Sequence, residues 1–411
     1  MKLRPHQIKF SKVIADKLNQ HSICYLSGEV RSGKTLTALE SAKLYDATSV
    51  LVVTKKKAIS SIENDYKNFG FTYKLTCINY ESLHKVKGRF DLIIYDEAHS
   101  LSKLGKPSKR TKLARQMFYK IPCILMTGSS AVESYSQYFH QFWVSKFSPF
   151  NEYKNFYKWV KDFVNVKELR LPTHTVKDYS DADIEKVDKY INPVLVVMSQ
   201  KDAGFETNIE EITLKVETPK LIRSLTDKLL KDKVIEGQTG FIFGDSPAKL
   251  QSKAHQLFNG SCIIEVGDGS TFTKIFSTFK ADFIKDYFKG QKIAMLYYYQ
   301  AELDILRQVF GADNLTTDLE EFNASDKNFA LQCTSTEGMN LSKAEALVVY
   351  NLGFSGTKWI QARDRMTVKG RKDNKVYIVC ESKGITKKIY DSVSQKKNFN
   401  SRIFKKEFLT H

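Results

Sequence analysis

The chain has 411 residues, of which 42% are hydrophobic and 27% are charged. This balance excludes an intrinsically disordered protein, and the length excludes a single small module, because it allows two or three domains that each bury a core. Lys and Arg total 64 against 46 Asp and Glu, a formal charge of +18 that favours a polyanionic partner such as nucleic acid. Charge alone leaves open the alternative that the lysines only keep the protein soluble.

Short apolar runs alternate with helical patterns in both halves of the chain. In the first 130 residues they predict buried strands at 22–26, 49–54, 76–79, 91–95 and 123–126. A later set predicts strands at 292–298, 330–334, 346–351 and 375–380. Because strands separated by helices form parallel sheets covered on both faces, we expect an α/β fold with two parallel-sheet lobes.

The segment between the lobes has a different texture, rich in aromatic residues and lysines from about 135 to 193. We interpret it as a helical insertion, with 167–188 as an exposed, partly extended excursion, and we predict an edge strand at 206–216 that opens the second lobe. The expected division is a first lobe over 1–140, an insertion over 141–195 and a second lobe over 196–411.

The first predicted strand leads directly into a glycine-rich loop followed by a helical pattern. The loop reads Gly-Glu-Val-Arg-Ser-Gly-Lys-Thr over 28–35 and satisfies the phosphate-binding pattern G-x-x-x-x-G-K-[ST] in its strand–loop–helix context. Gly28, Ser32 and Gly33 are expected to bring backbone N–H groups to the phosphates of ATP. Lys34 is expected to reach the β and γ phosphates, and the Thr35 hydroxyl to bind Mg²⁺.

The fourth predicted strand ends in Asp96-Glu97-Ala98-His99. Parallel strands end at one edge of the sheet, so both carboxylates are expected beside the phosphate loop. We assign Asp96 to Mg²⁺, and Glu97 to orienting and deprotonating the attacking water. Taken alone, the tetrapeptide could be a solvated turn; paired with the loop at 28–35, it predicts an ATP-hydrolysing centre.

At these motifs the chain resembles superfamily-two helicases, and within them the Swi/Snf-type translocases and compact phage-encoded DEAH-box DNA helicases. The likeness implies that both lobes are RecA-like and hold ATP between them. Leu3-Arg4-Pro5-His6-Gln7 resembles the family's glutamine motif, which implies that Gln7 reads the adenine. The segment 51–55 resembles an element that touches the nucleic-acid backbone, implying contacts from Thr54 and Lys55. The segment 80–83 resembles a tyrosine–serine element, which implies a nucleic-acid contact from Tyr80, and 125–130 resembles a motif coupling hydrolysis to motion.

Further resemblances lie in the second half. The segment 292–303 is similar to the strand that opens the family's coupling motifs, and 334–341 resembles a G-x-N-L motif. The latter implies that Thr336 and Asn340 contact nucleic acid and that Gly338 contacts the nucleotide. Gln361 and Arg365 match the family segment Q-A-x-D-R-x-H-R-I-G-Q, which implies catalytic roles for both.

One position departs from this segment, since Val368 stands where the family has its second arginine, the residue that reaches the γ phosphate. Such an arginine contributes about 10³–10⁵ in rate. We therefore expect Arg365 to supply the charge, with Arg363, Lys369 and Arg371 as alternatives. Slow hydrolysis that needs a stimulating protein partner is the other interpretation.

Candidate nucleic-acid contacts include the basic run at 103–112, with Lys103, Lys109 and Arg110, because it directly follows the acidic motif and resembles the family's next loop. Runs of charge are otherwise usually solvated faces. Trp159 in the insertion is expected in a core, with a wedge or a base-stacking surface as the less favoured alternative.

Six cysteines at 24, 77, 123, 262, 333 and 380 form no C-x-x-C pair, which predicts buried free thiols without structural zinc. The start Met1-Lys2-Leu3-Arg4-Pro5 has no apolar core, and no run approaches the length of a membrane span, so we expect a cytoplasmic protein without membrane contact, in the host cell if a phage encodes it.

Together these features predict an ATP- and Mg²⁺-dependent helicase or translocase that moves on, or remodels, duplex or branched DNA in replication, recombination or repair. An RNA helicase, a nucleic-acid-binding scaffold with a weakened ATPase, and a motor subunit serving a nuclease partner are the alternatives. The sequence shows no convincing carboxylate cluster of a nuclease.

Overall fold

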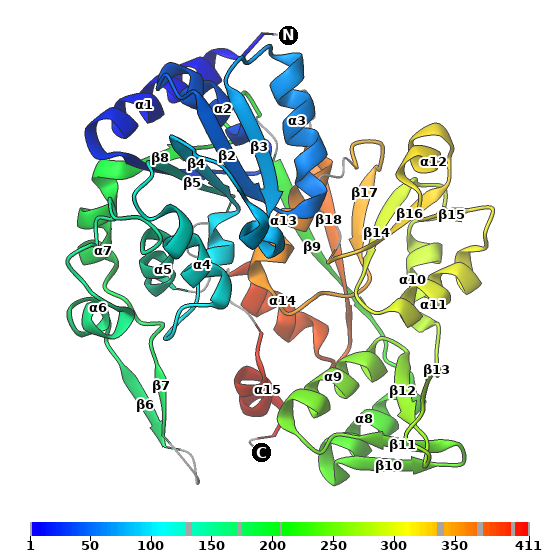
Figure 1. Ribbon diagram of the computed structural model, residues 1–411. Coiled ribbons are helices and arrows are strands. Elements are labelled where there is room, and N and C mark those ends of the chain that lie inside the picture. Colours follow the sequence, from blue (N-terminus) through cyan, green and yellow to red (C-terminus); the bar gives the residue numbers. More distant parts are fainter. Residues whose placement is uncertain are drawn as a thin grey trace. The chain divides into compact units, whose positions relative to one another are not determined.

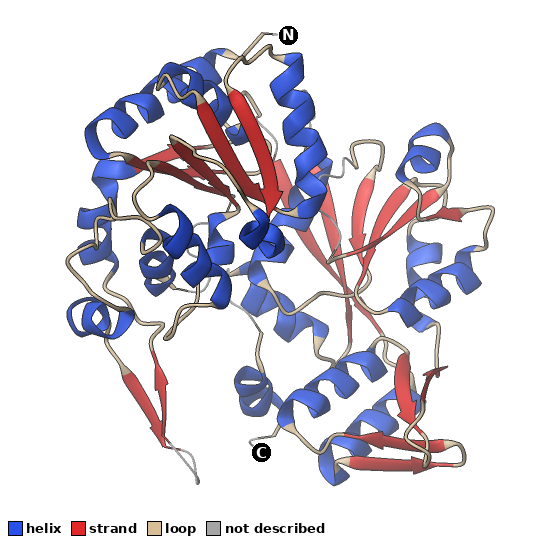
Figure 2. Ribbon diagram, viewed as in Figure 1, coloured by secondary structure: helices blue, strands red, loops and turns tan. Residues whose placement is uncertain are grey.

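The computed structural model describes residues 2–128, 134–170, 175–205, 208–334, 341–367, 373–395 and 399–409. The chain divides into two compact units, Met1–Phe205 and Glu206–His411 (Figure 1). Each unit is built around its own six-stranded parallel sheet (Figure 2). The predicted α/β fold with two parallel-sheet lobes is confirmed.

The sheet of the first unit has the order β3-β2-β4-β5-β1-β8, and all its neighbours pair in parallel. Its strands are β1 (Ile23–Gly28), β2 (Ser49–Thr54), β3 (Lys74–Asn79), β4 (Leu92–Asp96), β5 (Cys123–Thr127) and β8 (Leu195–Met198). Helix α1 (Pro5–His21) precedes β1, and α2 (Lys34–Leu44), α3 (Ile59–Asn68) and α4 (Lys109–Phe118) lie between successive strands. The predicted strands are therefore found within two residues of their expected ends.

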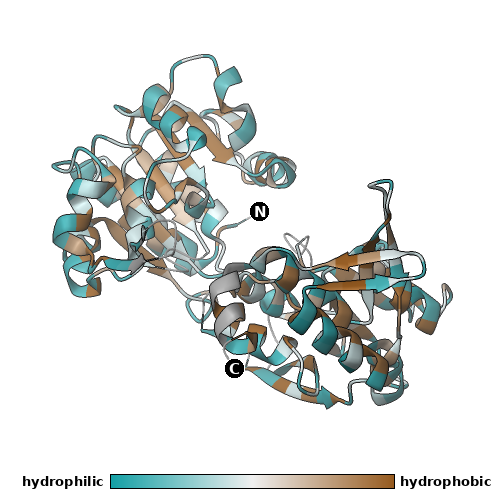
Figure 3. Cartoon of the chain, turned by 90° about the horizontal axis from the view of Figure 1, so that it is seen from below, coloured by the Kyte–Doolittle hydropathy of each residue, from teal (hydrophilic) through white to brown (hydrophobic). Residues whose placement is uncertain are grey.

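Both faces of this sheet are buried, which explains the continuous apolar runs. Alternate residues of one strand enter different cores: Ile93 and Tyr95 of β4 pack in one cluster, and Leu92 and Ile94 in the other. This is the side-chain alternation of an extended strand covered on both sides. Figure 3 shows strands of this unit largely in the brown of hydrophobic residues.

The aromatic-rich segment belongs to the first unit. It contains α5 (Tyr138–Phe142), α6 (Phe156–Phe163), the hairpin β6 (Lys167–Arg170) with β7 (Thr175–Asp178), and α7 (Ile184–Ile191). Its buried aromatic rings share one core with strands β1, β2, β4 and β5. Strand β8 follows and pairs with β1, so residues 196–205 lie in the first unit. The three-part division of the sequence stays a prediction.

Trp159 lies at the centre of this aromatic core. Its side chain is 0% exposed and stacks on Phe163 with ring centroids 4.9 Å apart and an interplanar angle of 6°. Phe139, Phe150 and Phe156 surround it at 5.5–5.9 Å. The alternative that Trp159 wedges a duplex is therefore wrong, because a side chain without exposed surface has no face to offer a base.

Replacing Trp159 by alanine is expected to lower the free energy of unfolding by about 3–5 kcal/mol, because it leaves a large cavity among aromatic rings. Urea titration followed by circular dichroism measures the loss. Trp159→Phe, which fills most of the volume, should lose much less. If both variants unfold like the unmodified chain, Trp159 is not a core residue.

The sheet of the second unit has the order β15-β16-β14-β17-β18-β9, again entirely parallel. Its strands are β9 (Asn208–Val216), β14 (Ile293–Tyr297), β15 (Leu315–Thr316), β16 (Asn328–Gln332), β17 (Ala346–Val349) and β18 (Asp373–Glu381). Its helices are α10 (Phe279–Tyr287), α11 (Gln300–Phe310), α12 (Leu319–Ala324), α13 (Gly356–Arg363), α14 (Thr386–Ser394) and α15 (Ser401–Phe408). The predicted edge strand at 206–216 is confirmed as β9.

A small antiparallel sheet in the second unit was not predicted. It has the order β10-β11-β12-β13, with β10 (Val234–Gly237), β11 (Gly240–Phe243), β12 (Ser261–Glu265) and β13 (Thr271–Ile275), beside α8 (Lys220–Asp232) and α9 (Pro247–Phe258). Every residue of β13 is exposed. The apolar runs in β11 and β12 span only three residues each, 241–243 and 262–264, which is too short to predict a strand and explains the omission.

The cysteines are free, and five of the six are buried, with Cys77 half-buried. Within the described ranges, no group of three or more His, Cys, Asp or Glu side chains is arranged to hold a metal ion. Among the same residues, no helix is both long and apolar enough to cross a membrane.

Candidate active site

The loop after β1 has the shape that phosphate binding needs. Gly33 has φ of +83° and caps the N-terminus of α2, which begins at Lys34. A Cβ on Gly28 would lie 3.0 Å from Ser32 Oγ and 3.1 Å from Lys34 Cβ, so the loop closes tightly over itself. Backbone N–H groups at the start of a helix and the helix dipole favour an anion at this place.

Helix α1 holds the phosphate loop from one side. Gln7 is 4% exposed; its Nε2 donates to the Gly33 carbonyl at 3.3 Å, while its Oε1 accepts from the Arg4 amide at 2.9 Å. His6 Nε2 lies 2.9 Å from the Ser32 carbonyl. The structure thus gives Gln7 a positioning role under the loop, and its reading of adenine stays a prediction.

The segment after β8 holds the loop from another side. The backbone N–H of Gln200 donates to Glu29 Oε2 at 2.6 Å, and the side-chain Nε2 of Gln200 donates to the Val30 carbonyl at 3.0 Å. The sequence analysis missed Gln200, which lies about 170 residues beyond the loop and carries no motif. Only the pairing of β8 with β1 brings it to the site.

Asp96 ends β4 and is almost completely buried, with 7% of its surface exposed. Its Oδ2 accepts from the Thr54 hydroxyl at 2.6 Å, and its Oδ1 accepts from the Glu97 amide at 3.0 Å. Burial, with the neighbouring charge of Glu97, raises the pKa of the Asp96 carboxyl. A buried carboxylate with two fixed donors is held in one orientation, as a metal ligand must be.

Glu97 adopts a left-handed backbone conformation with φ of 51°, unusual for a non-glycine residue and typical of strained functional positions. His99 Nδ1 lies 3.2 Å from Glu97 Oε2 and 3.0 Å from the Thr127 hydroxyl. Burial alone would raise the pKa of the Glu97 carboxyl, but His99, Lys34 and Lys55 outweigh it and lower the pKa to about 2. The carboxylate is therefore ionised.

Lys34 completes the group, because its charge acts on both Asp96 and Glu97. A Cβ on Gly128, just after β5, would lie 3.7 Å from Lys34 Nζ, in ordinary van der Waals contact, so the ammonium lies beside the end of β5. Ser32 Oγ is buried and has no hydrogen-bond partner among the described residues. A lysine, two acidic side chains, an unpaired buried hydroxyl and a helix N-terminus together fit a nucleotide triphosphate with Mg²⁺.

Thr54 and Tyr80, which were predicted to contact nucleic acid, lie against Asp96. Thr54 is 0% exposed and holds Asp96. Tyr80 is 3% exposed and its hydroxyl donates to the Asp96 carbonyl at 2.7 Å. In this structure both side chains position the acidic motif and offer little or no accessible surface, and the predicted contact of each residue with nucleic acid stays a prediction.

Replacing Thr54 by valine is expected to lower ATP turnover about 10- to 100-fold, because second-shell partners of metal ligands typically have effects of this size. The half-saturating Mg²⁺ concentration should rise at the same time. Thr226→Val is the matched control, since Thr226 is equally buried and its hydroxyl donates to the Ile222 carbonyl of its own helix in the second unit. Equal Mg²⁺ dependence in both variants would contradict the role of Thr54.

The predicted basic contacts lie on accessible surface. Lys103 and Lys109 are exposed, and Lys55 is half-exposed. Arg110 stacks over the Tyr80 ring at 5.1 Å and pairs with Glu81 at 2.5 Å. Contacts from these four residues with nucleic acid stay predictions.

The predicted residues of the second unit are only partly described. Gln361 and Arg365 are 7% and 8% exposed, at the end of α13 and just after it. Arg363, one alternative source of charge, is engaged by Glu211 at 2.8 Å and by Asp364 at 3.2 Å. Thr336, Gly338, Asn340, Val368, Lys369 and Arg371 lie outside the described residues.

A solved structure shares this architecture. The Pyrococcus furiosus Hef helicase domain matches with a TM-score of 0.52 and 14% identity, covering 96% of this chain and 100% of that chain. The two units have the fold of a helicase core. The SWI2/SNF2 ATPase core of Sulfolobus solfataricus in complex with dsDNA matches at 14% identity with a TM-score of 0.43, covering 96% of this chain and 91% of that chain. The same core domain alone has 14% identity and a TM-score of 0.42, covering 99% and 94%.

No protein-family model and no curated protein matches the sequence. The helicase fold is therefore shown by structural similarity, and at so low a sequence identity this similarity shows the fold alone. Within that fold, the phosphate loop, Asp96 and Glu97 meet at the carboxyl edge of the first sheet, where open parallel sheets bind their ligands. His99 and Thr127, whose pairing the sequence did not predict, lie in segments that it had singled out.

Proposed function

We propose that the chain is an ATP-dependent motor on DNA, a helicase or translocase. The observation that carries the proposal is the convergence of Lys34, Asp96 and Glu97 around the phosphate loop of a helicase fold. The formal charge of +18 supports a polyanionic track, since contacts with phosphates dominate affinity for nucleic acid.

Each residue has a distinct proposed role at the triphosphate. Lys34 and the N-terminus of α2 bind the β and γ phosphates, and Thr35 and Asp96 hold Mg²⁺, which supplies charge neutralisation when bound. The ionised Glu97 accepts a proton from the attacking water, with its carboxylate oriented by His99. Because His99 also contacts Thr127 at the end of β5, a change at Glu97 reaches the segment proposed to couple hydrolysis to motion.

The second unit contributes Arg365 and Gln361 in the roles that the family resemblance implies. Arg365 is proposed to supply positive charge to the γ phosphate, which stabilises the transition state. Exposed Lys103 and Lys109, with Lys55, are proposed to hold the phosphate backbone of the track without reading its sequence. Contacts with the γ phosphate stabilise one conformation of the chain. Hydrolysis removes these contacts, the chain changes to a second conformation, and this change moves it along the DNA.

Steady-state ATP hydrolysis with no nucleic acid, duplex DNA, forked DNA, single-stranded DNA and RNA tests the proposal. We expect stimulation by a DNA form and little by RNA. Stronger stimulation by RNA would favour an RNA helicase. A near-zero rate on every track, restored by Val368→Arg, would identify a binding scaffold or a motor that needs a protein partner.

A further inference from the structure

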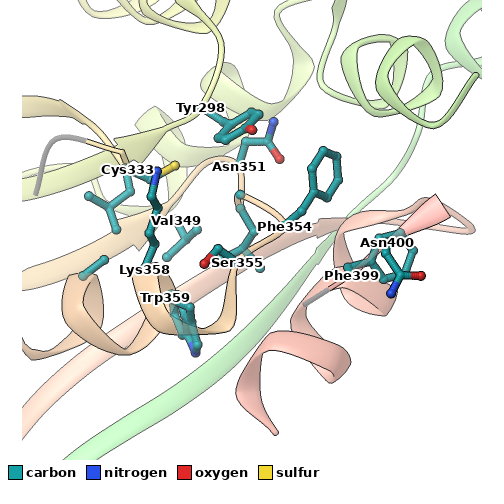
Figure 4. Close-up of a pocket in the computed structure, with 14 residues that line it drawn as sticks. Tyr298, Cys333, Val349, Asn351, Phe354, Ser355, Lys358, Trp359, Phe399 and Asn400 are labelled. Carbon is teal, nitrogen blue, oxygen red and sulfur yellow. The ribbon is translucent and has the colours of Figure 1, made fainter. Parts of the chain in front are cut away.

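The second unit contains a cavity of about 350 Å³ that no part of the proposed ATP chemistry uses (Figure 4). We propose that this cavity binds one unstacked base of a nucleic-acid strand, with the adjoining phosphate held at its rim by Lys358. The inference rests on the proposed function, because it names the part of the track that the second unit recognises.

The cavity lies where open parallel sheets bind ligands. Strand β14 stands between β16 and β17, and the chain crosses from β16 on one side to β17 on the other. The crevice at the carboxyl ends of strands, at such a change of direction, is the usual ligand site of this architecture. Tyr298 follows β14, Cys333 follows β16 and Phe354 follows β17, and all three line the cavity.

Aromatic rings form much of its wall. Phe354 is half-buried, with its ring centroid 5.8 Å from that of Tyr298 and 6.2 Å from that of Phe399. Trp359 lines the same cavity from the second turn of α13. Aromatic faces suit a nucleobase, because stacking contributes about 1–3 kcal/mol per base and tolerates every base. The volume also falls within the range of about 300–1,000 Å³ common for small-ligand sites.

The positive charge of the lining indicates that the bound base carries a phosphate group. Lys358 is the only charged residue among the described residues that line the cavity, and no acidic side chain lines it. Its side chain is exposed and extends towards Cys333 in Figure 4. Ser355, which caps the N-terminus of α13, makes no capping hydrogen bond with its hydroxyl. A phosphate at the rim would meet an ammonium, a hydroxyl and a helix N-terminus.

The polar groups of the lining favour a planar ligand with hydrogen-bonding edges over a purely apolar one. Asn351 is fully buried and its Nδ2 donates to Glu302 Oε1 at 2.5 Å, which fixes the amide beside Tyr298. Trp359 Nε1 is buried without a hydrogen-bond partner among the described residues. A base, with donors and acceptors around a flat ring, suits a lining that is aromatic and partly polar better than an apolar protein segment does.

Equilibrium binding without ATP tests the proposal on the full-length chain. The probe is a short single-stranded oligonucleotide carrying one fluorescent adenine analogue whose emission falls on stacking. We expect quenching on binding. We also expect a matched strand with abasic sites throughout to bind about 5- to 150-fold more weakly, the equivalent of one stacked base. This comparison uses the unmodified protein and so does not depend on the folding of a variant.

Variants locate the effect in the cavity. Phe354→Leu should lose the quenching and bind the normal strand about 5- to 150-fold more weakly, whereas Phe354→Tyr keeps a ring and should retain both. Lys358→Gln should weaken binding of the strand and lower the salt dependence of that binding, because one phosphate contact is lost. Lys358→Arg keeps the positive charge and should restore both the affinity and its salt dependence. Phe272→Leu, which removes an exposed ring from β13, is the matched control.

Equal affinity for normal and abasic strands, or quenching that survives Phe354→Leu, would overturn the proposal. Free adenosine monophosphate that binds as tightly as the strand would overturn it too, because the cavity would then be a site for small nucleotides. These outcomes differ from failure of the proposed function, which appears as ATP hydrolysis that no nucleic acid stimulates.

Discussion

Replacing Glu97 by glutamine is expected to lower ATP turnover by about 10²–10⁴-fold, the range typical for loss of a general base. Glutamine keeps the size of the side chain but cannot accept the proton of the attacking water. Burial raises the pKa of this carboxyl, but His99, Lys34 and Lys55 outweigh it, so the carboxylate is in the ionised form that can accept a proton. ATP should still bind, since the phosphate loop and Asp96 are unchanged.

Two measurements separate these effects. Single-turnover hydrolysis measures the rate of the chemical step, and equilibrium binding of a fluorescent ATP analogue measures the affinity of the phosphate loop for nucleotide. Glu63→Gln is the matched control, because Glu63 is an exposed carboxylate on α3 of the same unit. A Glu97→Gln chain that hydrolyses ATP at the normal rate would remove Glu97 from the mechanism, and one that fails to bind ATP would make its role structural.

Replacing Lys34 by alanine is expected to abolish productive ATP binding and to lower turnover by at least about 10²–10³-fold, the cost of losing one preorganised electrostatic contact in an active site. The ammonium would otherwise face the phosphates from the first turn of α2. Its removal also takes away a positive charge that lowers the pKa of both Asp96 and Glu97, so these carboxyls should protonate more readily.

The expected signature is a loss of nucleotide affinity together with turnover, unlike Glu97→Gln, which should lose turnover alone. Lys43→Ala on the same helix is the control, because Lys43 is largely exposed and pairs with Glu40. Nucleotide binding unchanged by Lys34→Ala would contradict the assignment of the phosphate loop.

The sequence was informative where local chemistry dictates structure. The strand–loop–helix around Gly33 and the acidic end of β4 could be placed because only certain residues suit a tight turn and a phosphate. The parallel sheets followed from their buried apolar runs, and β2 has the predicted limits. These features depend on residues close together in the chain.

What the sequence did not predict depends on distant residues. Thr54 and Tyr80 looked like contacts for a ligand, yet both hold Asp96, and only the packing of β2 beside β4 shows this. Gln200 reaches the phosphate loop through β8, and the cavity beside Phe354 forms where three strands end. Burial and pairing of this kind leave no local signature in sequence.

The central claim is that ATP hydrolysis drives movement along DNA, and displacement of a third strand from a duplex tests it most directly. The unmodified chain with ATP should release a triplex-forming oligonucleotide from duplex DNA, and neither Glu97→Gln nor the unmodified chain with a non-hydrolysable ATP analogue should do so. Rapid ATP hydrolysis without any displacement, or displacement that continues in Glu97→Gln, would contradict the account.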